Sequence, residues 1–176
     1  MEQTEAILIN RRPWSDTSLL TVWFSPLHGK LSAMARSARK PESPFAGRLD
    51  LFHRAEIGFA RSRKSSLHAL REVRLIEPFG STEPASVFLC GYFAELVDLI
   101  THPGEPSPEI YGLLARAVSH LGSKPATLRA MKFFEDEVTR LLGVGDGKSC
   151  ALAAIETYCG KIPASRKAAM SLLPKP

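Results

Sequence analysis

Hydrophobic and polar residues alternate with a period of two over much of the first 80 positions, which is typical of half-buried β-strands. In residues 30–36, the apolar face holds Leu31 and two alanines. The alternation is longest in residues 49–60, where it places Phe52 on the outward face. The sequence predicts five strands, over residues 4–12, 17–25, 30–36, 49–60 and 67–76.

The second half of the chain changes to helical spacing. Residues 85–101 are apolar on nearly every side, as expected for a central helix. Residues 108–121 and 126–142 each carry one apolar stripe, and Gly143 predicts the end of the latter helix. Two shorter helices are expected over residues 149–159 and 164–173.

This order of elements predicts an α+β protein, because the strands and the helices are segregated along the chain. Five short antiparallel strands commonly close into a small barrel, and the OB-fold is one such barrel. We therefore expect an OB-fold domain over residues 1–80 and an all-helical domain over residues 81–176. Proline and glycine cluster at the boundary between them.

Length and cysteine content restrict the class of protein. In these 176 residues, no apolar run approaches the ~18 residues of a membrane span. The start of the chain lacks the basic and apolar blocks of a secretory signal. Three cysteines, an odd number, favour a reducing cytoplasm over a disulfide framework, and all three are expected to be buried thiols.

The excess of positive charge is confined to the first half. Residues 1–80 carry 13 Lys and Arg against 8 Asp and Glu, whereas residues 81–176 carry 10 of each. With a pI of about 9.3, this asymmetry favours a polyanionic partner, most often nucleic acid. The alternative is a basic surface that only aids solubility.

A basic loop follows the third predicted strand. Arg36, Arg39 and Lys40 stand beside small residues and before Pro41, so phosphates could approach the backbone closely. Lys30, on the polar face of the preceding strand, could extend the same patch. A solvated loop is the alternative interpretation.

Two further segments carry cations. Arg61, Arg63 and Lys64 crowd the predicted hairpin tip, where they could clasp a DNA backbone or simply block edge-to-edge pairing. Arg11 and Arg12 precede Trp14, which could stack a base or be a buried structural tryptophan.

Two phenylalanines are further candidate stacking platforms. Phe45 lies in the basic loop, and Phe52 is predicted on an outward strand position. Phe52 could equally pack beneath the helical region, and that interpretation is favoured.

Motifs for catalysis are poor, and no enzyme activity, cofactor or metal is predicted. Residues 143–149 superficially resemble a phosphate-binding loop, but Leu142 stands where the motif needs glycine, and the segment follows a helix. The five histidines are scattered, and no CxxC pair occurs. His53 and His68 could face each other on paired strands, which more often reflects packing than catalysis.

Several short segments, in order, resemble one family. They are residues 4–8, 16–20, the turn at 28–31, the basic loop at 35–41, positions 49 and 52, and 77–79. Each segment is weak alone, but their order and spacing are similar to those of the RecO family of recombination mediators. The family usually has glycine where this chain has Ser37.

The resemblance implies an OB-fold followed by a helical domain, a cytoplasmic protein at the nucleoid, and no bond chemistry. It implies binding to single- and double-stranded DNA, strand annealing, contacts with RecR and single-strand-binding protein, and help in loading RecA onto coated DNA. The basic loop, Lys30 and the hairpin tip would contact DNA. Some members hold zinc with four cysteines after a Leu-Gly segment; only Cys150 and Cys159 follow here, so no zinc is expected.

In the family, the helical domain also receives the acidic-hydrophobic C-terminal tail of single-strand-binding protein. Arg129, Lys132 and Arg140 share a helix whose other face is apolar, which suits such a peptide, although a solvated face is the alternative. The helical part of this chain is shorter than in most members. Two rival functions stay open: an OB-fold RNA-binding protein of translation, and an adaptor that acts through its helical half.

Overall fold

The computed structural model describes residues 1–145 and 150–174. The chain divides into two compact units. The first, the barrel unit, comprises Met1–Phe79 together with Thr101–Tyr111. The second, the helical unit, comprises Gly80–Ile100 and Gly112–Pro176. Segment 101–111 therefore groups with the strands, although it follows a helix in the sequence.

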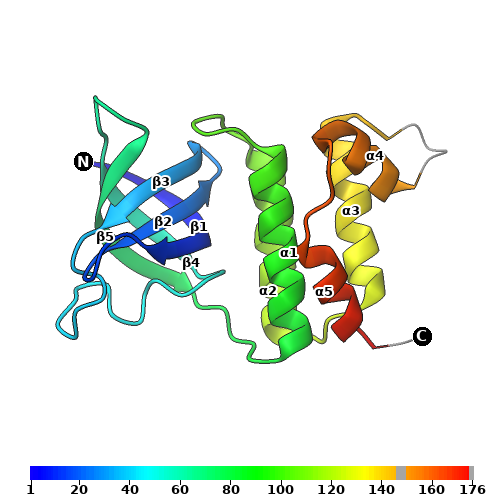
Figure 1. Ribbon diagram of the computed structural model, residues 1–176, viewed down its shortest axis with the longest axis horizontal. Helices are drawn as coiled ribbons and strands as arrows, with labels where there is room; N and C mark the ends of the chain where they lie inside the picture. The colour runs from blue at the N-terminus through cyan, green and yellow to red at the C-terminus, as the bar shows by residue number, and fades with distance from the viewer. Residues whose placement is uncertain (146–149, 175–176) are drawn as a thin grey trace. The chain divides into compact units, whose positions relative to one another are not determined.

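The barrel unit contains the predicted strands in a closed barrel of order β1-β2-β3-β5-β4 (Figure 1). Only β3 and β5 pair in parallel, and the other neighbours are antiparallel. This closed barrel followed by helices confirms the predicted fold class. The strands are β1 (Glu2–Pro13), β2 (Leu19–Ser25), β3 (Gly29–Ala35), β4 (Arg54–Ala60) and β5 (Leu67–Glu77).

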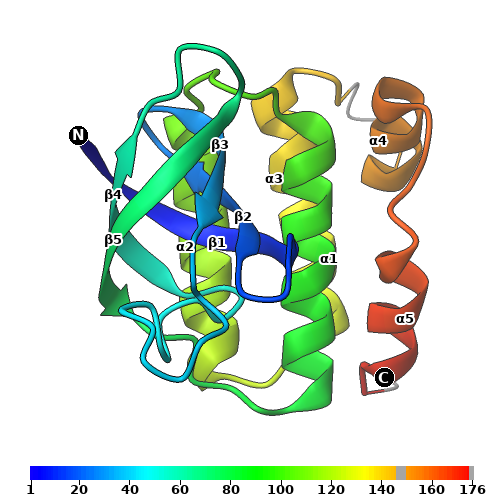
Figure 2. The same ribbon diagram turned by 60° about the vertical axis from the view of Figure 1, so that its left-hand side comes forward.

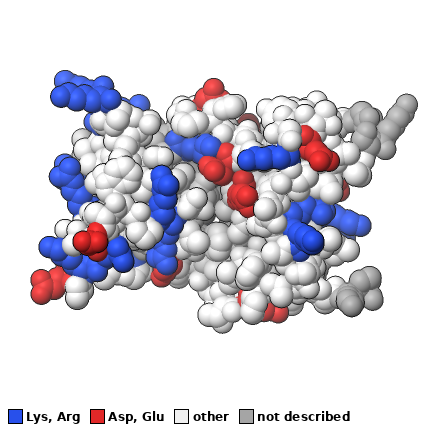
Figure 3. All heavy atoms as spheres, in the orientation of Figure 1, with Lys and Arg blue, Asp and Glu red and all other residues white. Residues whose placement is uncertain are grey.

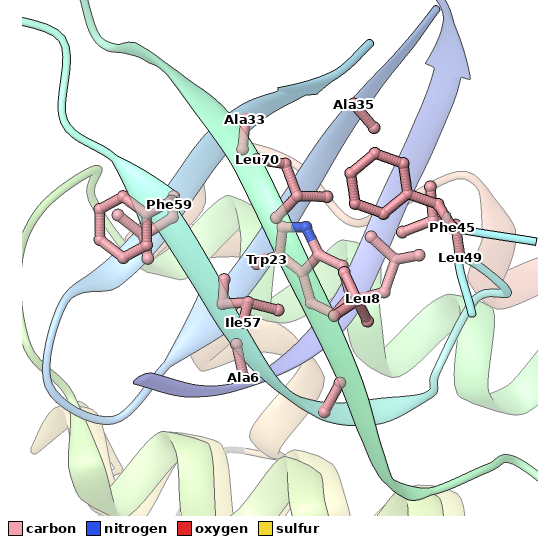
Figure 4. Close-up of a cluster of buried hydrophobic side chains, with 13 residues drawn as sticks. Ala6, Leu8, Trp23, Ala33, Ala35, Phe45, Leu49, Ile57, Phe59 and Leu70 are labelled. Atoms are coloured by element: carbon pink, nitrogen blue, oxygen red, sulfur yellow. The ribbon is translucent and has the colours of Figure 1, made fainter. Parts of the chain in front are cut away.

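Trp23 fills the centre of the barrel (Figure 4). Its indole is fully buried, and its Nε1–H donates to Thr21 Oγ1 over 3.0 Å. The alternating residues of the strands surround it, including Leu31 and Ala33 of β3 and Ile57 of β4, as the period of two predicts. The barrel is thus held by a packed apolar interior.

The fourth strand is shorter than its alternation indicates. Residues 49–53 form a turn rather than a strand, and Phe52 has a left-handed φ of 69°. The Phe52 N–H donates to Leu8 O over 2.8 Å, which turns the backbone out of the ladder. Phe52 is consequently buried against Phe79, with ring centroids 5.3 Å apart. Its predicted outward position is therefore wrong.

Two other expectations about this region need correction. Phe45 is 6% exposed and packs in the barrel core, so it is no stacking platform. His53 does not face His68: its Nδ1 accepts the Phe79 N–H, whereas His68 pairs in register with Ala33. The antiparallel register of β4 with β5, which pairs Arg54 with Glu77 and Ala60 with Ala69, places the two histidines at opposite ends of the strand pair.

Gly29 allows the segment after the first helix to approach the barrel. A Cβ at this position would lie 2.0 Å from the Glu105 carbonyl oxygen, and its φ is +60°. The Gly104 N–H donates to Lys30 O over 3.2 Å in the same contact. Glycine is thus required here for two reasons, its left-handed backbone and the nearness of another chain segment.

The helical unit has a central apolar helix, α1, as predicted, with nine buried residues. Helix α5 packs on α1 and α4 on α3 (Figure 2). Thr127 caps the start of α3, and Gly143 ends it in the left-handed conformation. The helices are α1 (Pro84–Ile100), α2 (Pro108–Ser123), α3 (Leu128–Leu142), α4 (Ala151–Cys159) and α5 (Ser165–Leu172).

The cysteine prediction is only partly right. Cys90 is buried in α1, where burial raises the pKa of its thiol. Cys150 is exposed and Cys159 half-buried, because the short helix α4 buries only Ile155. The end of the glycine-rich segment 143–149 and the predicted start of the fourth helix at 149 lie outside the described residues.

Within residues 1–145 and 150–174, no three His, Cys, Asp or Glu side chains are grouped so that they could hold a metal ion. Over the same residues, none of the helices combines the length and apolar character needed to cross a bilayer.

Candidate nucleic-acid interface

Five of the predicted DNA-contacting residues gather at one end of the barrel. The register pairs Arg12 with Leu20 and, across β2, Leu20 with Met34, so the end of β1 lies beside the end of β3. Arg39 then ties the basic loop to the β1–β2 turn: its Nη1 donates to Ser15 O over 3.0 Å. We call this group the loop cluster; it comprises Arg12, Trp14, Arg36, Arg39 and Lys40.

The loop cluster is open to solvent. Trp14 is 53% exposed, which leaves its ring available for stacking. The side chains of Arg12, Arg36 and Lys40 are exposed and form no ion pair with any residue that the structure describes. Cations without a protein partner keep their full charge for an external anion.

A second group lies at the opposite end of β3. The register of β3 with β5 places the β4–β5 connection, residues 61–66, near the start of β3. This tip cluster comprises Lys30, Arg61, Arg63 and Lys64. Arg61 is held by Glu2 through bonds of 2.8 and 2.9 Å, which raise the pKa of Arg61. Arg63 and Lys64 are exposed, and neither forms an ion pair within residues 1–145 and 150–174.

Lys30 was predicted to extend the patch of the basic loop, but the structure places it at the opposite end of β3. Lys30 lies in β3 and Arg36 directly follows its last residue, so the extended backbone spaces them by roughly 20 Å at about 3.3 Å per residue. That span matches about six nucleotides of a stacked DNA strand. Lys and Arg side chains are spread over the barrel unit in the space-filling view (Figure 3).

The sequence did not point to Arg71 as a candidate DNA contact, and the structure gives Arg11 a role in the fold instead. Arg71 of β5 is exposed. Because the parallel register pairs Met34 with Ala69, Arg71 lies at about the same height along the barrel as Arg36. Arg71 lies at a β-bulge. Its position next to buried Leu70 could have identified it as an outward-facing residue. Arg11 instead contacts the Leu49 carbonyl and pairs with Asp50 at 3.0 Å, which anchors the turn before β4.

The helical unit carries an apolar groove of about 530 Å³. Phe93 and Phe134 stack at its base with centroids 3.9 Å apart. Phe133, 60% exposed, and Arg116 also line it. Sequence analysis overlooked Phe133, although two adjacent phenylalanines on one helix cannot both face the core.

The three cations predicted to bind a peptide differ in their placement. Arg129 lines the groove, and Lys132 lines a shallower hollow that adjoins it through Arg129 and Phe133. Arg140 is held by Glu137 through two bonds of 2.8 and 3.0 Å, which lower the pKa of Glu137. Arg140 lines neither hollow.

Comparison with known proteins places both units in one family. The family model described as Recombination protein O N terminal matches residues 1–79, and Recombination protein O C terminal matches residues 82–152. The chain belongs to the RecO family. The two matched regions cover the barrel strands and most of the helices.

Curated RecO relatives are similar over most of this chain. DNA repair protein RecO of Coxiella burnetii is 32% identical over 154 residues, covering 82% of this chain and 62% of its own length. The protein of the same name from Pelobacter propionicus is 29% identical over 144 residues, covering 81% and 58%. That from Geobacter sulfurreducens is 28% identical, covering 86% and 63%. The chain thus spans about three fifths of the length of these relatives.

Proposed function

We propose that this RecO-family chain binds DNA through its phosphates and anneals complementary strands in recombinational repair, without catalysing bond chemistry. The observation that carries the proposal is a set of exposed cations at both ends of β3 that form no ion pair within residues 1–145 and 150–174: Arg12, Arg36 and Lys40 at one end, and Arg63 and Lys64 at the other. The relatives, each named DNA repair protein RecO, support the biological setting. We further propose that it acts in the cytoplasm at the nucleoid, with RecR, and helps load RecA onto DNA coated with single-strand-binding protein.

The proposed mechanism is electrostatic. Two DNA strands repel each other through their phosphates, and cations from both clusters would neutralise part of that charge. Contacts to phosphates carry no base information, so sequence preference should be slight. The exposed ring of Trp14 adds a stacking surface that accepts any base.

The double substitution Arg36→Gln/Lys40→Gln should weaken binding to single-stranded DNA and flatten its salt dependence. Loss of two phosphate contacts reduces the log–log slope by about 1.4, at roughly 0.7 per contact. Fluorescence anisotropy with a labelled oligothymidine over a salt series measures both quantities.

Arg74→Gln is the matched control for this experiment. Arg74 is 67% exposed, but Glu56 and Glu72 already neutralise it at 3.0 and 3.2 Å. Its loss should leave the slope unchanged. Equal slopes for the wild type and the double variant would contradict the proposal.

Competition by structured RNA, if stronger than by single-stranded DNA, would favour the rival RNA-binding function.

Annealing itself needs a separate assay. Complementary oligonucleotides coated with single-strand-binding protein should anneal faster in the presence of this chain, and the double variant should lose most of that acceleration. An adaptor that acts only through its helices would give no difference between the wild type and the double variant.

The groove supports a second function. We propose that it binds the acidic-hydrophobic C-terminal tail of single-strand-binding protein. Its apolar floor and exposed Phe133 suit the hydrophobic end of such a peptide, while Arg116 and Arg129 would pair with its carboxylates.

Phe133→Ala should lower the affinity for that tail peptide by about tenfold, the usual effect of removing an aromatic anchor from an interface. Isothermal titration with a synthetic peptide measures the change. Lys167→Gln, an exposed cation on α5, is the control and should bind like the wild type. The same titration with Arg140→Gln tests the contribution predicted from the sequence. Undiminished binding by Phe133→Ala would exclude the groove.

A further inference from the structure

A small polar pocket lies beside the tip cluster, wholly within the barrel unit. It has a volume of about 250 Å³. The turn before β3, the β4–β5 connection, β5 and the segment 101–111 all contribute to its wall. The side chains that can donate hydrogen bonds there are His28, Lys30, Ser32, Arg61, Ser66 and His68. Neither histidine was predicted to bind a ligand, and His68 was interpreted only as a packing residue.

Both imidazoles are positioned by the buried ring of Phe59. His68 stacks on it at 5.5 Å, and His28 meets it edge-on at 5.6 Å. His68 Nδ1 accepts the Ser62 N–H over 3.3 Å. The neutral imidazole therefore carries its proton on Nε2, which makes Nε2 a hydrogen-bond donor.

One cation of the pocket, Arg61, already pairs with an anion from its own chain. Glu2 of β1 binds Arg61, which lowers the pKa of the Glu2 carboxyl, and His28 and His68 lower it further. Burial lowers the pKa of His68, as does Arg61, whereas Glu2 raises it. Segment 101–111 adds the exposed residues His102 and Glu105 nearby. The basic side chains of the pocket thus come from several elements, and a single carboxylate, Glu2, pairs with one of them.

We propose that this pocket binds one phosphate group of a DNA strand. A phosphate presents several acceptor oxygens, and the pocket offers donors from several directions: Lys30, Arg61 and the two imidazoles. The bound phosphate competes with Glu2 for Arg61. This inference rests on the proposed DNA binding, because it gives the tip cluster a specific phosphate subsite.

Binding should strengthen as the pH falls through the histidine range. Protonation of His68 adds positive charge, and a bound phosphate favours the charged form of its ring. In ¹H NMR titrations, inorganic phosphate should therefore raise the pKa of His68. Chloride at equal ionic strength is the control, and an unchanged His68 titration with phosphate would overturn the proposal.

Oligonucleotides with either a 5′-phosphate or a 5′-hydroxyl distinguish the two sources of the group. If the pocket takes a terminal phosphate, the 5′-phosphorylated strand should bind about tenfold more tightly near pH 6, the effect of one charge-assisted contact. If it takes an internal phosphate, both strands should bind equally, and His68→Gln should weaken both and reduce their pH dependence.

Glu2→Gln supplies a test that misfolding cannot imitate. Removal of the competing carboxylate should tighten phosphate binding several-fold, whereas His68→Gln should weaken it. If neither variant alters phosphate or DNA binding, and the salt slope remains steep, the pocket proposal fails while the proposed DNA binding stands. A flat salt slope for the wild type would instead contradict the proposed DNA binding itself.

Discussion

Glu135→Ala is expected to lower the free energy of unfolding by about 3–5 kcal/mol, the usual result of removing one partner from a buried ion pair. Glu135 is 3% exposed on α3. Arg166 of α5 donates to it through bonds of 2.6 and 3.3 Å, and the Tyr92 hydroxyl of α1 donates over 2.7 Å. One carboxylate therefore joins three helices, and its loss leaves the Arg166 guanidinium in the interior without its counter-ion.

Two comparisons isolate the cause. Glu137→Ala removes a similar arginine partner from the same helix, but that pair is exposed, and the change in stability should be small. The double variant Glu135→Met/Arg166→Met replaces both charges with apolar side chains and should recover most of the loss. Urea unfolding monitored by circular dichroism measures all three. A Glu135→Ala variant as stable as the wild type would contradict a structural role for the pair.

Trp23→Ala should also destabilise the protein by about 3–5 kcal/mol, because it empties the centre of the barrel. The indole is fully buried, and the side chains around it come from every strand of the barrel. Thr21 keeps its own bond to the Ala33 carbonyl, so the loss comes mainly from the cavity.

Trp14 provides the matched control, since the chain has two tryptophans. Trp14→Ala removes an exposed ring and should change stability by no more than about 0.5 kcal/mol. In a Trp14→Phe background, the remaining fluorescence reports on Trp23 alone and should shift to longer wavelength on unfolding. A Trp23→Ala variant that unfolds at the wild-type urea concentration would show that the barrel core tolerates the cavity.

Periodicity predicted the strands well wherever one face of a strand points into the barrel. The alternation of Leu31 and its neighbours describes β3 as the structure has it. It failed in residues 49–53, because Phe52 leaves the extended conformation and hydrogen-bonds to β1. The conformation of Phe52 depends on its contact with β1, which is far away in the sequence, and the local pattern of residues does not encode such a contact.

The chemistry of the interface was predictable, whereas its spatial arrangement was not. Charge asymmetry identified the cations of the basic loop and the tip, but their placement at opposite ends of β3 follows from strand register. The groove around Phe133 requires three helices to meet, and the pocket beside His68 requires segment 101–111 to return to the strands. Both depend on contacts between residues far apart in the chain.

The packing of segment 101–111 against the barrel strands also determines where the chain can be truncated. The ring of Tyr111 lies 6.1 Å from that of Phe24, and its hydroxyl donates to Glu5 over 2.6 Å. A fragment that stops at residue 80 would lack this cover and leave apolar surface open to self-association. Any portion that keeps Tyr111 must include α1 as well, so trimming from the carboxyl end cannot release an intact barrel by itself.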